Sequence, residues 1–492
     1  MTLREPKKRK LSPTITSNSD KIENDENICA DILDSEKFNF ANLFQMDDMV
    51  FEILRFLDWK FILRVCMRVS KQWNSKSLDI PLTISISERR SMGQHCLKCI
   101  AHCESLRNLT SLSLSHNNMK PNEIELIVTA ENMKNVTSLN LSGNKLVPST
   151  INSITKCMDK LTSLYLSCSQ INCESVKNIA ISEKMKRLKT LDLSSNLIGP
   201  IGVKHIAESE NLKNLITIDL SWNAIGPSGA KYFADNFENV KNLKVLHLID
   251  TGILSDGASF IASSEIMKNL TSLNLCDNDI GTKGATCIAS SPHTTNLKTL
   301  DLSGNNIGSD GALFITSSVH LKNLTELYLQ RNNIGSESMM QIAKSPNLKS
   351  VTQLDLSSNN INDTGTQYIA NGVNLLNLRI LRLRGNGITS TGVHYIANSE
   401  NLQNLTLLDL STNRVDAEGA KFIANSQTLQ NITALNLYDN CIGSKGAQLI
   451  LNGVNLKNLM ELNLIYNQIG TDNANVLANH NNNKQKKLKF FY

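Results

Sequence analysis

One nine-residue pattern, repeated along most of the chain, constrains the fold more than any other feature. The pattern is Leu-x-x-Leu-x-Leu-x-x-Asn, as in Leu297–Asn305, and an Ile-Gly pair follows it. A Gly-Ala pair and an apolar stretch with helical spacing complete each unit. One such unit cannot bury its own leucines, but stacked units can. Self-similarity at a fixed period therefore predicts a solenoid rather than a compact globule.

The sequence contains fourteen copies of this frame, and two of them are degenerate. The spacing between successive asparagines is 27 residues, and only the degenerate copies, which end in Ser169 and Thr251, disturb it by one or two residues. The copies are Leu109–Asn117, Val136–Asn144, Leu161–Ser169, Leu188–Asn196, Leu215–Asn223, Leu243–Thr251, Leu270–Asn278, Leu297–Asn305, Leu324–Asn332, Val351–Asn359, Leu378–Asn386, Leu405–Asn413, Ile432–Asn440 and Leu459–Asn467.

Each part of the unit has a physical role. The Leu-x-Leu core alternates with period two, so its leucines face inward from a short strand while the intervening residue faces solvent. The Gly-Ala-x-x-Ile-Ala segment supplies a helix that covers the other side of the core. The asparagine amide can satisfy buried backbone groups where the chain turns, so we expect less regular turns at Ser169 and Thr251. The glycine after each isoleucine marks a position that needs backbone freedom.

This frame resembles the leucine-rich-repeat family, specifically its ribonuclease-inhibitor-like subclass, from about Leu78 to Ala478. The resemblance implies an α/β solenoid, a horseshoe with parallel strands on the concave face and helices on the convex face. A partial copy, with a strand near Ile84 and a helix around Ile100, is expected to cap the array. At the other end of the array, the polar C-terminal tail is expected to form a short strand near Leu488 and Phe491.

The periodicity changes before the repeats. Apolar residues fall on one face of a short helix at Val50, Ile53, Leu54 and Leu57, and a second helix is expected from Phe61 to Trp73. About forty residues cannot build a full core alone. The remaining apolar surface of this small all-α module must therefore contact the solenoid cap or another protein.

The segment from Asp47 to Trp73 resembles an F-box. The shared features are the acidic pair, Glu-Ile-Leu, Phe-Leu-Asp and the Val-Ser-Lys-x-Trp ending. The family usually opens with Leu-Pro, and these positions hold Gln45 and Met46 here. By resemblance, the residues that contact a Skp-type adaptor are Phe44, Met46, Val50, Ile53, Leu54 and Leu57. The alternative is a plain helical cap that only seals the solenoid.

An F-box followed by leucine-rich repeats implies the substrate receptor of a cullin-based (SCF-type) ubiquitin ligase. In that architecture the F-box binds the Skp-type adaptor and cullin complex, and the concave face holds a target protein. The chain is then not an enzyme, needs no cofactor, and is a monomer within a larger complex. The expected domains are a tail at 1–37, the F-box-like module at 38–77, the solenoid at 78–480 and a polar basic tail at 481–492.

Two alternatives remain open. The chain is a non-ligase protein-binding scaffold if the helical module is only a cap. A GTPase-activating protein of the Ran type shares this repeat subclass, but the sequence has no acidic C-terminal tail and no arginine that stands out as a finger.

The exposed strand positions are expected to bind the target, over a surface of protein size. Aromatic residues and arginines dominate the energetics of such interfaces. Asp192 and Asp219 favour a basic partner segment, whereas Arg382, between Asp355 and Asp409, is expected to relieve like-charge crowding. The candidate target-binding residues are Tyr165, Trp222, His247, Tyr328, Arg331, Arg382, Arg384, Tyr438 and Tyr466.

Composition narrows the remaining functions. The net charge of +5 is too small to indicate a nucleic-acid or membrane partner, and no run approaches 18 apolar residues. The N-terminus has no apolar signal-peptide segment, so the Asn-x-Thr sequons and the eleven cysteines are read as unmodified groups of an intracellular protein.

Two further motifs concern cellular location and metal binding. The cluster of Lys7, Lys8, Arg9 and Lys10 resembles a nuclear-import signal read by importin, which places the chain in the nucleus, the cytoplasm or both. The His and Cys residues between His95 and Cys103 would all lie on one helix, whereas structural zinc sites usually draw ligands from two elements. No metal site is therefore predicted.

Overall fold

The structure is a computed structural model that describes residues 82–86, 94–102, 106–470 and 489–491. The chain divides into two units, Met1–Ile80 and Pro81–Tyr492, and all described residues belong to the second. The F-box-like module and the basic cluster at Lys7–Lys10 therefore lie outside the described residues. Among the described residues, no helix is both long enough and apolar enough to cross a bilayer.

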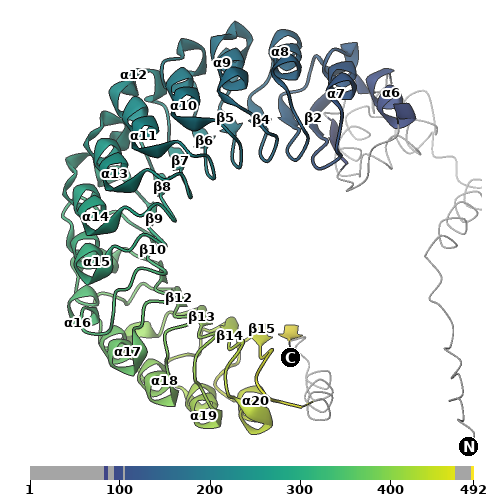
Figure 1. Cartoon of the computed structure of the whole chain (residues 1–492). Coiled ribbons are helices and arrows are strands. Elements are labelled where there is room, and N and C mark those ends of the chain that lie inside the picture. The colour runs from purple at the N-terminus through teal and green to yellow at the C-terminus, as the bar shows by residue number, and fades with distance from the viewer. Residues whose placement is uncertain (1–81, 87–93, 103–105, 471–488, 492) are drawn as a thin grey trace, which may run out of the picture. The chain divides into compact units, whose positions relative to one another are not determined.

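Sixteen described strands form one parallel sheet in which each strand pairs with its neighbours in the sequence (Figure 1). The predicted fold class, an α/β solenoid, is confirmed. The strands are β1 (Leu82–Ser85), β2 (Leu109–Ser113), β3 (Ser138–Asn140), β4 (Ser163–Tyr165), β5 (Thr190–Asp192), β6 (Thr217–Asp219), β7 (Val245–His247), β8 (Ser272–Asn274), β9 (Thr299–Asp301), β10 (Glu326–Tyr328), β11 (Gln353–Asp355), β12 (Ile380–Arg382), β13 (Leu407–Asp409), β14 (Ala434–Asn436), β15 (Glu461–Asn463) and β16 (Lys489–Phe491).

The register joins equivalent positions of successive repeats. Leu300 of β9 pairs with Leu327 of β10, and Asp301 pairs with Tyr328. The middle residue of a strand is buried, while its first and third residues are at least partly exposed in most repeats. We call the side that carries the first and third residues the inner surface, because it lies on the concave side of the repeat unit in Figure 1.

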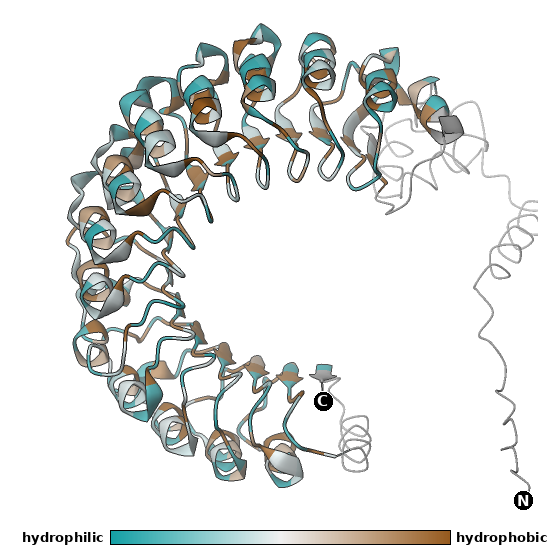
Figure 2. Cartoon of the chain, in the orientation of Figure 1, coloured by the Kyte–Doolittle hydropathy of each residue, from teal (hydrophilic) through white to brown (hydrophobic). Residues whose placement is uncertain are grey.

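Helices cover the opposite side of the sheet, as the sequence predicts, and the apolar core lies between the two layers (Figure 2). They are α6 (Gln94–His102), α7 (Pro121–Val128), α8 (Pro148–Cys157), α9 (Cys173–Ile181), α10 (Gly199–Ala207), α11 (Gly226–Asp235), α12 (Phe237–Val240), α13 (Leu254–Ser263), α14 (Gly281–Ser290), α15 (Gly308–Ser317), α16 (Met339–Ile342), α17 (Asn362–Ala370), α18 (Ser390–Ala397), α19 (Ala417–Asn425) and α20 (Gly443–Asn452).

Short 3-10 turns lead from many of these helices to the next strand. They are η4 (Glu131–Met133), η5 (Glu183–Arg187), η6 (Glu210–Leu212), η7 (Glu265–Lys268), η8 (Pro292–Asn296), η9 (Pro346–Lys349) and η10 (Glu400–Leu402).

Two glycines in each typical repeat shape the helix. Gly308 has φ +67°, a left-handed conformation that most side chains resist. Gly311 lies where an added Cβ would be 2.8 Å from Cβ of Ile307 and 3.2 Å from Cβ of Ala285. Ser338 stands at the position of Gly311 in the next repeat, and there the helix α16 is only four residues long.

The buried asparagines form a hydrogen-bonded ladder along the array, as the sequence predicts. The Asn305 side chain donates to the carbonyls of Leu275 (2.7 Å) and Ser303 (3.0 Å). Its Oδ1 accepts from the backbone N–H of Asn278 (2.9 Å) and of Ile280 (3.3 Å) in the preceding repeat. Each amide thus satisfies buried backbone groups of two repeats, which an apolar side chain could not do.

Ser169 and Thr251 interrupt this ladder in the way their short side chains require. In regular repeats the N–H two residues after the asparagine donates to the next asparagine side chain, as Ile280 does to Asn305 Oδ1 (3.3 Å). Before Ser169 this N–H, from Leu146, donates to the main-chain carbonyl of Ser169 (3.0 Å), and before Thr251 it comes from Ile225 and donates to Asn223 O of its own repeat (2.6 Å). The expected irregularity is therefore a local exchange of acceptors.

Both predicted end structures are present. Strand β1 and helix α6, with Ile100 and Ala101 buried, form the expected N-terminal cap. Strand β16 pairs in parallel with β15, so the sheet extends into the segment 481–492 that the sequence assigns to a polar tail.

Candidate functional site: the inner surface

The nine candidate target-binding residues occupy three neighbouring columns at the C-terminal ends of the strands. The strand-end column holds Tyr165, His247, Tyr328 and Arg382; the column two residues later holds Arg384 and Tyr438. The third column, one residue further on, holds Trp222, Arg331 and Tyr466, all with φ between +54° and +59°. Trp222 is 50% exposed and Tyr466 is 69% exposed, so both can contact a partner.

Only some of these candidates contact one another. The rings of Tyr438 and Tyr466 stack edge to face, with their centroids 5.2 Å apart, near the C-terminal end of the array. Such a pair forms a rigid apolar patch at low entropic cost. Among the described residues, no ring contact joins Tyr165, Trp222 or Tyr328 to another aromatic residue on this surface.

An ion pair crosses a whole repeat in the middle of the inner surface. Nη2 of Arg331 lies 2.9 Å and 2.8 Å from the two carboxylate oxygens of Asp277, which is 54 residues earlier in the sequence. Gly304 occupies the same column between them, and a Cβ there would lie only 1.9 Å from Asp277 Oδ1. The missing side chain of Gly304 therefore allows this pair to form.

The neighbouring thiol is held in its neutral form. Sγ of Cys276 lies 3.2 Å from Oδ2 of Asp277. Burial, together with this hydrogen bond, raises the pKa of the Cys276 thiol to about 12. Because the thiolate is the reactive form of cysteine, Cys276 is not an activated nucleophile at neutral pH.

Tyr328 is fixed by a small polar network. Its hydroxyl donates to Glu326 Oε2 (3.2 Å) and accepts from Gln353 Nε2 (2.7 Å). Burial, followed by the negative charge of Glu326, raises the pKa of Tyr328 to about 12. The phenol therefore stays protonated and acts as an oriented hydrogen-bonding group.

Burial also raises the pKa of Asp301, whose Oδ1 accepts from the Ser303 N–H at 2.9 Å.

Arg382 does not neutralise its acidic neighbours by direct contact. It is in register with Asp355 on one side and Asp409 on the other, as the sequence predicts. Among the described residues, however, no ion pair joins Arg382 to either carboxylate, and its buried Nη1 has no hydrogen-bond partner. Arg384, two residues later, is exposed.

Comparison with known protein families identifies the fold. Ten segments match the leucine-rich repeat family model: 105–122, 186–207, 211–234, 267–289, 293–315, 320–343, 347–370, 374–397, 401–424 and 428–451. The chain is a leucine-rich-repeat protein. Leucine-rich repeats are protein-binding modules, and their strands here present the columns described above. No curated protein matches the sequence.

A search of solved structures found chains similar to this one. An internalin (inlF) from Listeria monocytogenes str. 4b F2365 is 18% identical to this leucine-rich-repeat chain, with a TM-score of 0.43. The match covers 75% of this chain and 94% of the internalin chain.

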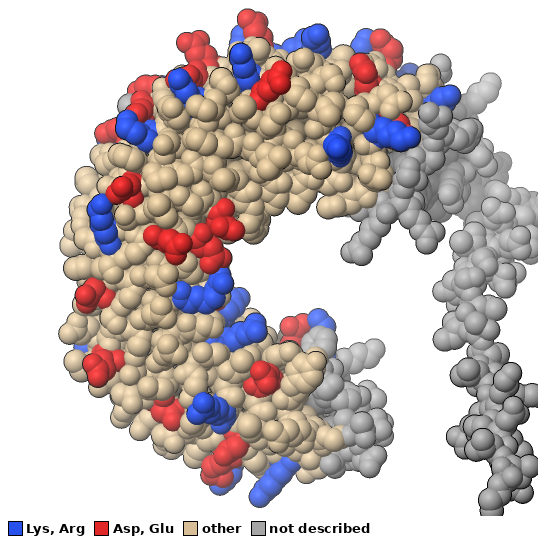
Figure 3. Space-filling view, in the orientation of Figure 1, with Lys and Arg blue, Asp and Glu red and all other residues tan. Residues whose placement is uncertain are grey.

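Two acidic side chains on the inner surface of the leucine-rich repeats have no cation in direct contact. Asp192 and Asp219 accept hydrogen bonds only from Ser194 and Ser221 among the described residues, so no cation neutralises them. The arginines lie further along, from β10 to β12. Figure 3 shows acidic side chains gathered beside basic ones at the middle of the inner edge.

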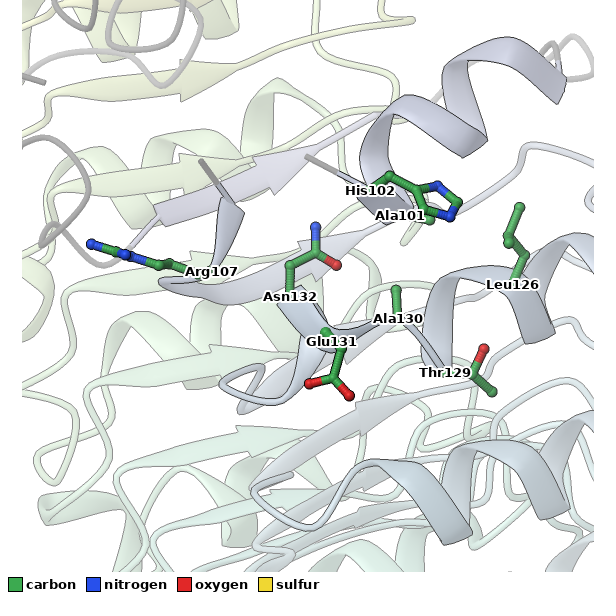
Figure 4. A pocket seen from close by; sticks show the side chains of 8 residues that line it. All are labelled: Ala101, His102, Arg107, Leu126, Thr129, Ala130, Glu131 and Asn132. Carbon is green, nitrogen blue, oxygen red and sulfur yellow. The ribbon is translucent and has the colours of Figure 1, made fainter. Parts of the chain in front are cut away.

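A hollow on the helical side of the first repeats is a weaker candidate for a functional site than the inner surface. Figure 4 shows side chains from α6, α7 and η4 around it. Asn132 donates to the carbonyl of Ile100 (2.7 Å), and the His102 ring lies 2.9 Å from the Lys98 carbonyl. Within the described ranges, no group of three or more His, Cys, Asp or Glu could hold a metal ion.

Sequence reasoning missed several residues that organise the inner surface. Asp277, Gly304, Glu326 and Gln353 hold or permit the contacts of Arg331 and Tyr328. All four are polar or small residues of kinds typical of a repeat surface, so a single copy of the repeat does not reveal their roles. Aligning the copies would have placed Gly304 between Asp277 and Arg331 in one column.

Proposed function

We propose that this leucine-rich-repeat protein is the target-recognition subunit of a cullin-based ubiquitin ligase. The observation that carries the binding part is the inner surface, where exposed Trp222, Arg384 and Tyr466 accompany the uncompensated carboxylates of Asp192 and Asp219. Exposed aromatic and arginine side chains are the groups that dominate protein interfaces. The surface extends over many strands about 4.8 Å apart, which suits a protein rather than a small molecule.

The ligase part of the proposal is supported by sequence. The F-box-like segment lies outside the described residues, and its apolar residues Val50, Ile53, Leu54 and Leu57 share one face of the expected helix. In this proposal that face binds a Skp-type adaptor and so joins the chain to the cullin complex. The chain performs no chemistry itself, and it raises the effective concentration of target lysines near the conjugating enzyme.

Adaptor capture tests this part directly. Full-length chain is mixed with purified Skp-type adaptor at micromolar concentrations and analysed by size-exclusion chromatography. We expect Leu54→Asp/Leu57→Asp to abolish the complex, whereas Gln72→Asp/Asn74→Asp, which adds the same two charges at polar positions, leaves it intact. If the unmodified chain captures no adaptor, the ligase proposal fails and a leucine-rich-repeat binding scaffold remains.

Target capture tests the inner surface separately. Proximity labelling in cells, with and without proteasome inhibition, is compared for the unmodified chain and for Trp222→Ser/Arg384→Ser. The labelled proteins that depend on these two side chains are the candidate targets. Ile181→Ser/Lys177→Ser on helix α9 removes one apolar group and one cation from the outer side, and we expect it to leave the labelling unchanged. Equal loss in both variants would mean that the inner surface does not select the target.

The cellular location belongs to the same proposal. The cluster of Lys7, Lys8, Arg9 and Lys10 is proposed to bind importin and to bring the ligase receptor into the nucleus as well as the cytoplasm. Lys7→Ala/Lys8→Ala/Arg9→Ala/Lys10→Ala is expected to shift a fluorescent fusion out of the nucleus. An unchanged distribution would contradict this part.

A further inference from the structure

A second surface of the solenoid differs in charge from the inner one. A hollow lies at the N-terminal ends of the strands β4 to β7. It is lined by Thr162, Lys186, Arg187, Lys189, Asn214, Ile216, Asn242 and Lys244. Four of the eight residues are basic and none is acidic. We call this hollow and the column of edge residues that continues it to Lys298 the basic edge.

The backbone holds the cations of the basic edge in a regular row. The N–H of Ile216 donates to Lys189 O and the N–H of Lys244 donates to Ile216 O, both at 2.8 Å. Lys189 and Lys244 are therefore two strand spacings apart, about 10 Å. Side-chain amides of Asn214 and Asn242 donate to the carbonyls of Lys186 (2.7 Å) and Lys213 (2.8 Å) and fix the outer wall.

The lysines of this column replace a residue with a structural role. Elsewhere in the column a threonine hydroxyl donates to the carbonyl one repeat earlier, as Thr162 does to Thr137 O and Thr325 to Lys298 O, both at 3.1 Å. Seven described threonines make this bond. Lys189, Lys244 and Lys298 give up the bond and place a cation at the edge instead.

Of the four cations that line the hollow, only Lys186 forms an ion pair within the described part of the chain. Ion pairs use the lysines that lie further out, such as Lys186 with Glu183 (3.5 Å) and Lys241 with Glu238 (3.1 Å). The side chains of Arg187, Lys189 and Lys244 are exposed and take part in no ion pair between described residues. Like charges held this close favour an anionic partner.

We propose that the basic edge binds an extended acidic peptide segment of a partner protein. From Lys189 to Lys298 the column spans four strand spacings, about 19 Å, which matches about six extended residues. Ile216 and Thr271 separate the three lysines of the column, so the basic edge is not the continuous basic stripe that a nucleic-acid duplex requires. The hollow has no aromatic residue on which unpaired bases could stack. This inference does not depend on the ligase proposal.

Peptide binding by the full-length chain tests the proposal. The probe is a fluorescein-labelled peptide of about eight residues alternating Glu and Ser, followed by fluorescence anisotropy. We expect binding that weakens as salt increases, because exposed charges are screened. Lys189→Thr/Lys244→Thr should weaken it about fivefold to tenfold, since two exposed ion pairs are lost. Threonine is the residue found elsewhere in this column, so the variant is expected to fold.

The matched control is Lys349→Thr/Arg379→Thr. It also removes two positive charges near the N-terminal ends of strands, but in repeats outside the basic edge. We expect its affinity for the peptide to stay within about twofold of the unmodified chain. Equal weakening in both variants would show a mere net-charge effect and overturn the proposal. So would the absence of salt-sensitive binding to the unmodified chain at about 1 mM peptide.

Two competitors test other occupants. A duplex or single-stranded RNA that binds more tightly than the peptide, and does so through Lys189 and Lys244, would overturn the assignment to a peptide. A synthetic peptide of residues 20–36, the acidic segment of this same chain, is the second competitor. Clearly tighter binding of that peptide would make the occupant intramolecular and overturn the assignment to a partner protein.

Discussion

Two asparagine ladders run along this leucine-rich-repeat protein with the same period, and they differ in burial. In the buried ladder, Asn332 donates to carbonyls of two repeats and accepts from two backbone N–H groups. In the exposed ladder, Asn323 makes one bond, from its amide to Thr295 O at 2.7 Å. Both positions look equally regular in the sequence. Regular recurrence therefore shows that a residue belongs to the repeat, but not how much stability depends on it.

The exposed ladder also explains the recurring Asn-x-Thr sequons. In Asn323-Leu-Thr325 the asparagine donates to Thr295 O and the threonine hydroxyl donates to Lys298 O (3.1 Å). The same pair of bonds recurs at Asn404 and Thr406. Both polar residues of the motif are thus accounted for by hydrogen bonds between repeats.

The largest expected effect comes from the buried ladder. Asn332→Ala removes the amide that satisfies backbone groups on both sides of a buried turn, so we expect the free energy of unfolding to fall by about 2–4 kcal/mol. Urea denaturation followed by circular dichroism measures it. A loss below about 1 kcal/mol would mean that water replaces the amide and that the two ladders are equivalent.

A smaller loss is expected from the exposed ladder. Asn323→Ala removes one solvent-exposed hydrogen bond whose acceptor can bind water instead, so the stability should fall by about 0.5 kcal/mol. The same urea titration, run beside Asn332→Ala, gives the ratio between the ladders. A loss equal to that of Asn332→Ala would contradict the distinction by burial.

A third set of side chains, Asn or Asp at the ends of strands, sharpens the comparison. Asn274 accepts from the Cys276 N–H at 2.9 Å, and Asp301 accepts from the Ser303 N–H at the same distance one repeat later. Burial raises the pKa of Asp301, so its ionised form is disfavoured in the folded chain. Asp301→Asn keeps the hydrogen bond and removes the charge, and we expect a gain on the order of 0.5 kcal/mol at neutral pH.

The stability gained by Asp301→Asn should depend on pH. As pH rises above the ordinary value of 3.8, the unfolded chain loses the Asp301 proton first, which lowers the stability of the folded state. The advantage of Asp301→Asn should therefore be present at pH 7 and vanish below 3.8. Asp409→Asn, which keeps an equivalent bond to the Ser411 N–H (2.8 Å), is the control. A pH-independent gain would point to packing instead.

The smallest effect is expected where the exposed ladder already has an exception. Ser350 stands at the position of Asn323 in the next repeat, and its hydroxyl donates to Lys322 O at 2.9 Å. Ser350→Asn should change the stability by no more than a few tenths of a kcal/mol, because one exposed bond replaces another. A change above about 1 kcal/mol would show that the exposed ladder requires asparagine specifically.

Much of the fold followed from the sequence because its determinants are local and repeated. The alternation around Leu300, the buried amide of Asn305 and the left-handed Gly308 each follow from a single unit. The site was less predictable, since its contacts join different repeats. The Asp277–Arg331 pair depends on the missing side chain of Gly304 between them. The partners of Tyr328 likewise come from two strands.

The strict pairing of each strand with the strands of adjacent repeats has a consequence for how the chain folds. A contact such as Leu300 with Leu327 closes a loop of only 27 residues, and similarly short loops of 25 to 28 residues join the other neighbouring strands. Any group of neighbouring repeats can therefore serve as the nucleus, and growth can proceed in both directions. Unfolding should therefore begin at the terminal repeats and progress inward, and the whole array should not unfold in a single step.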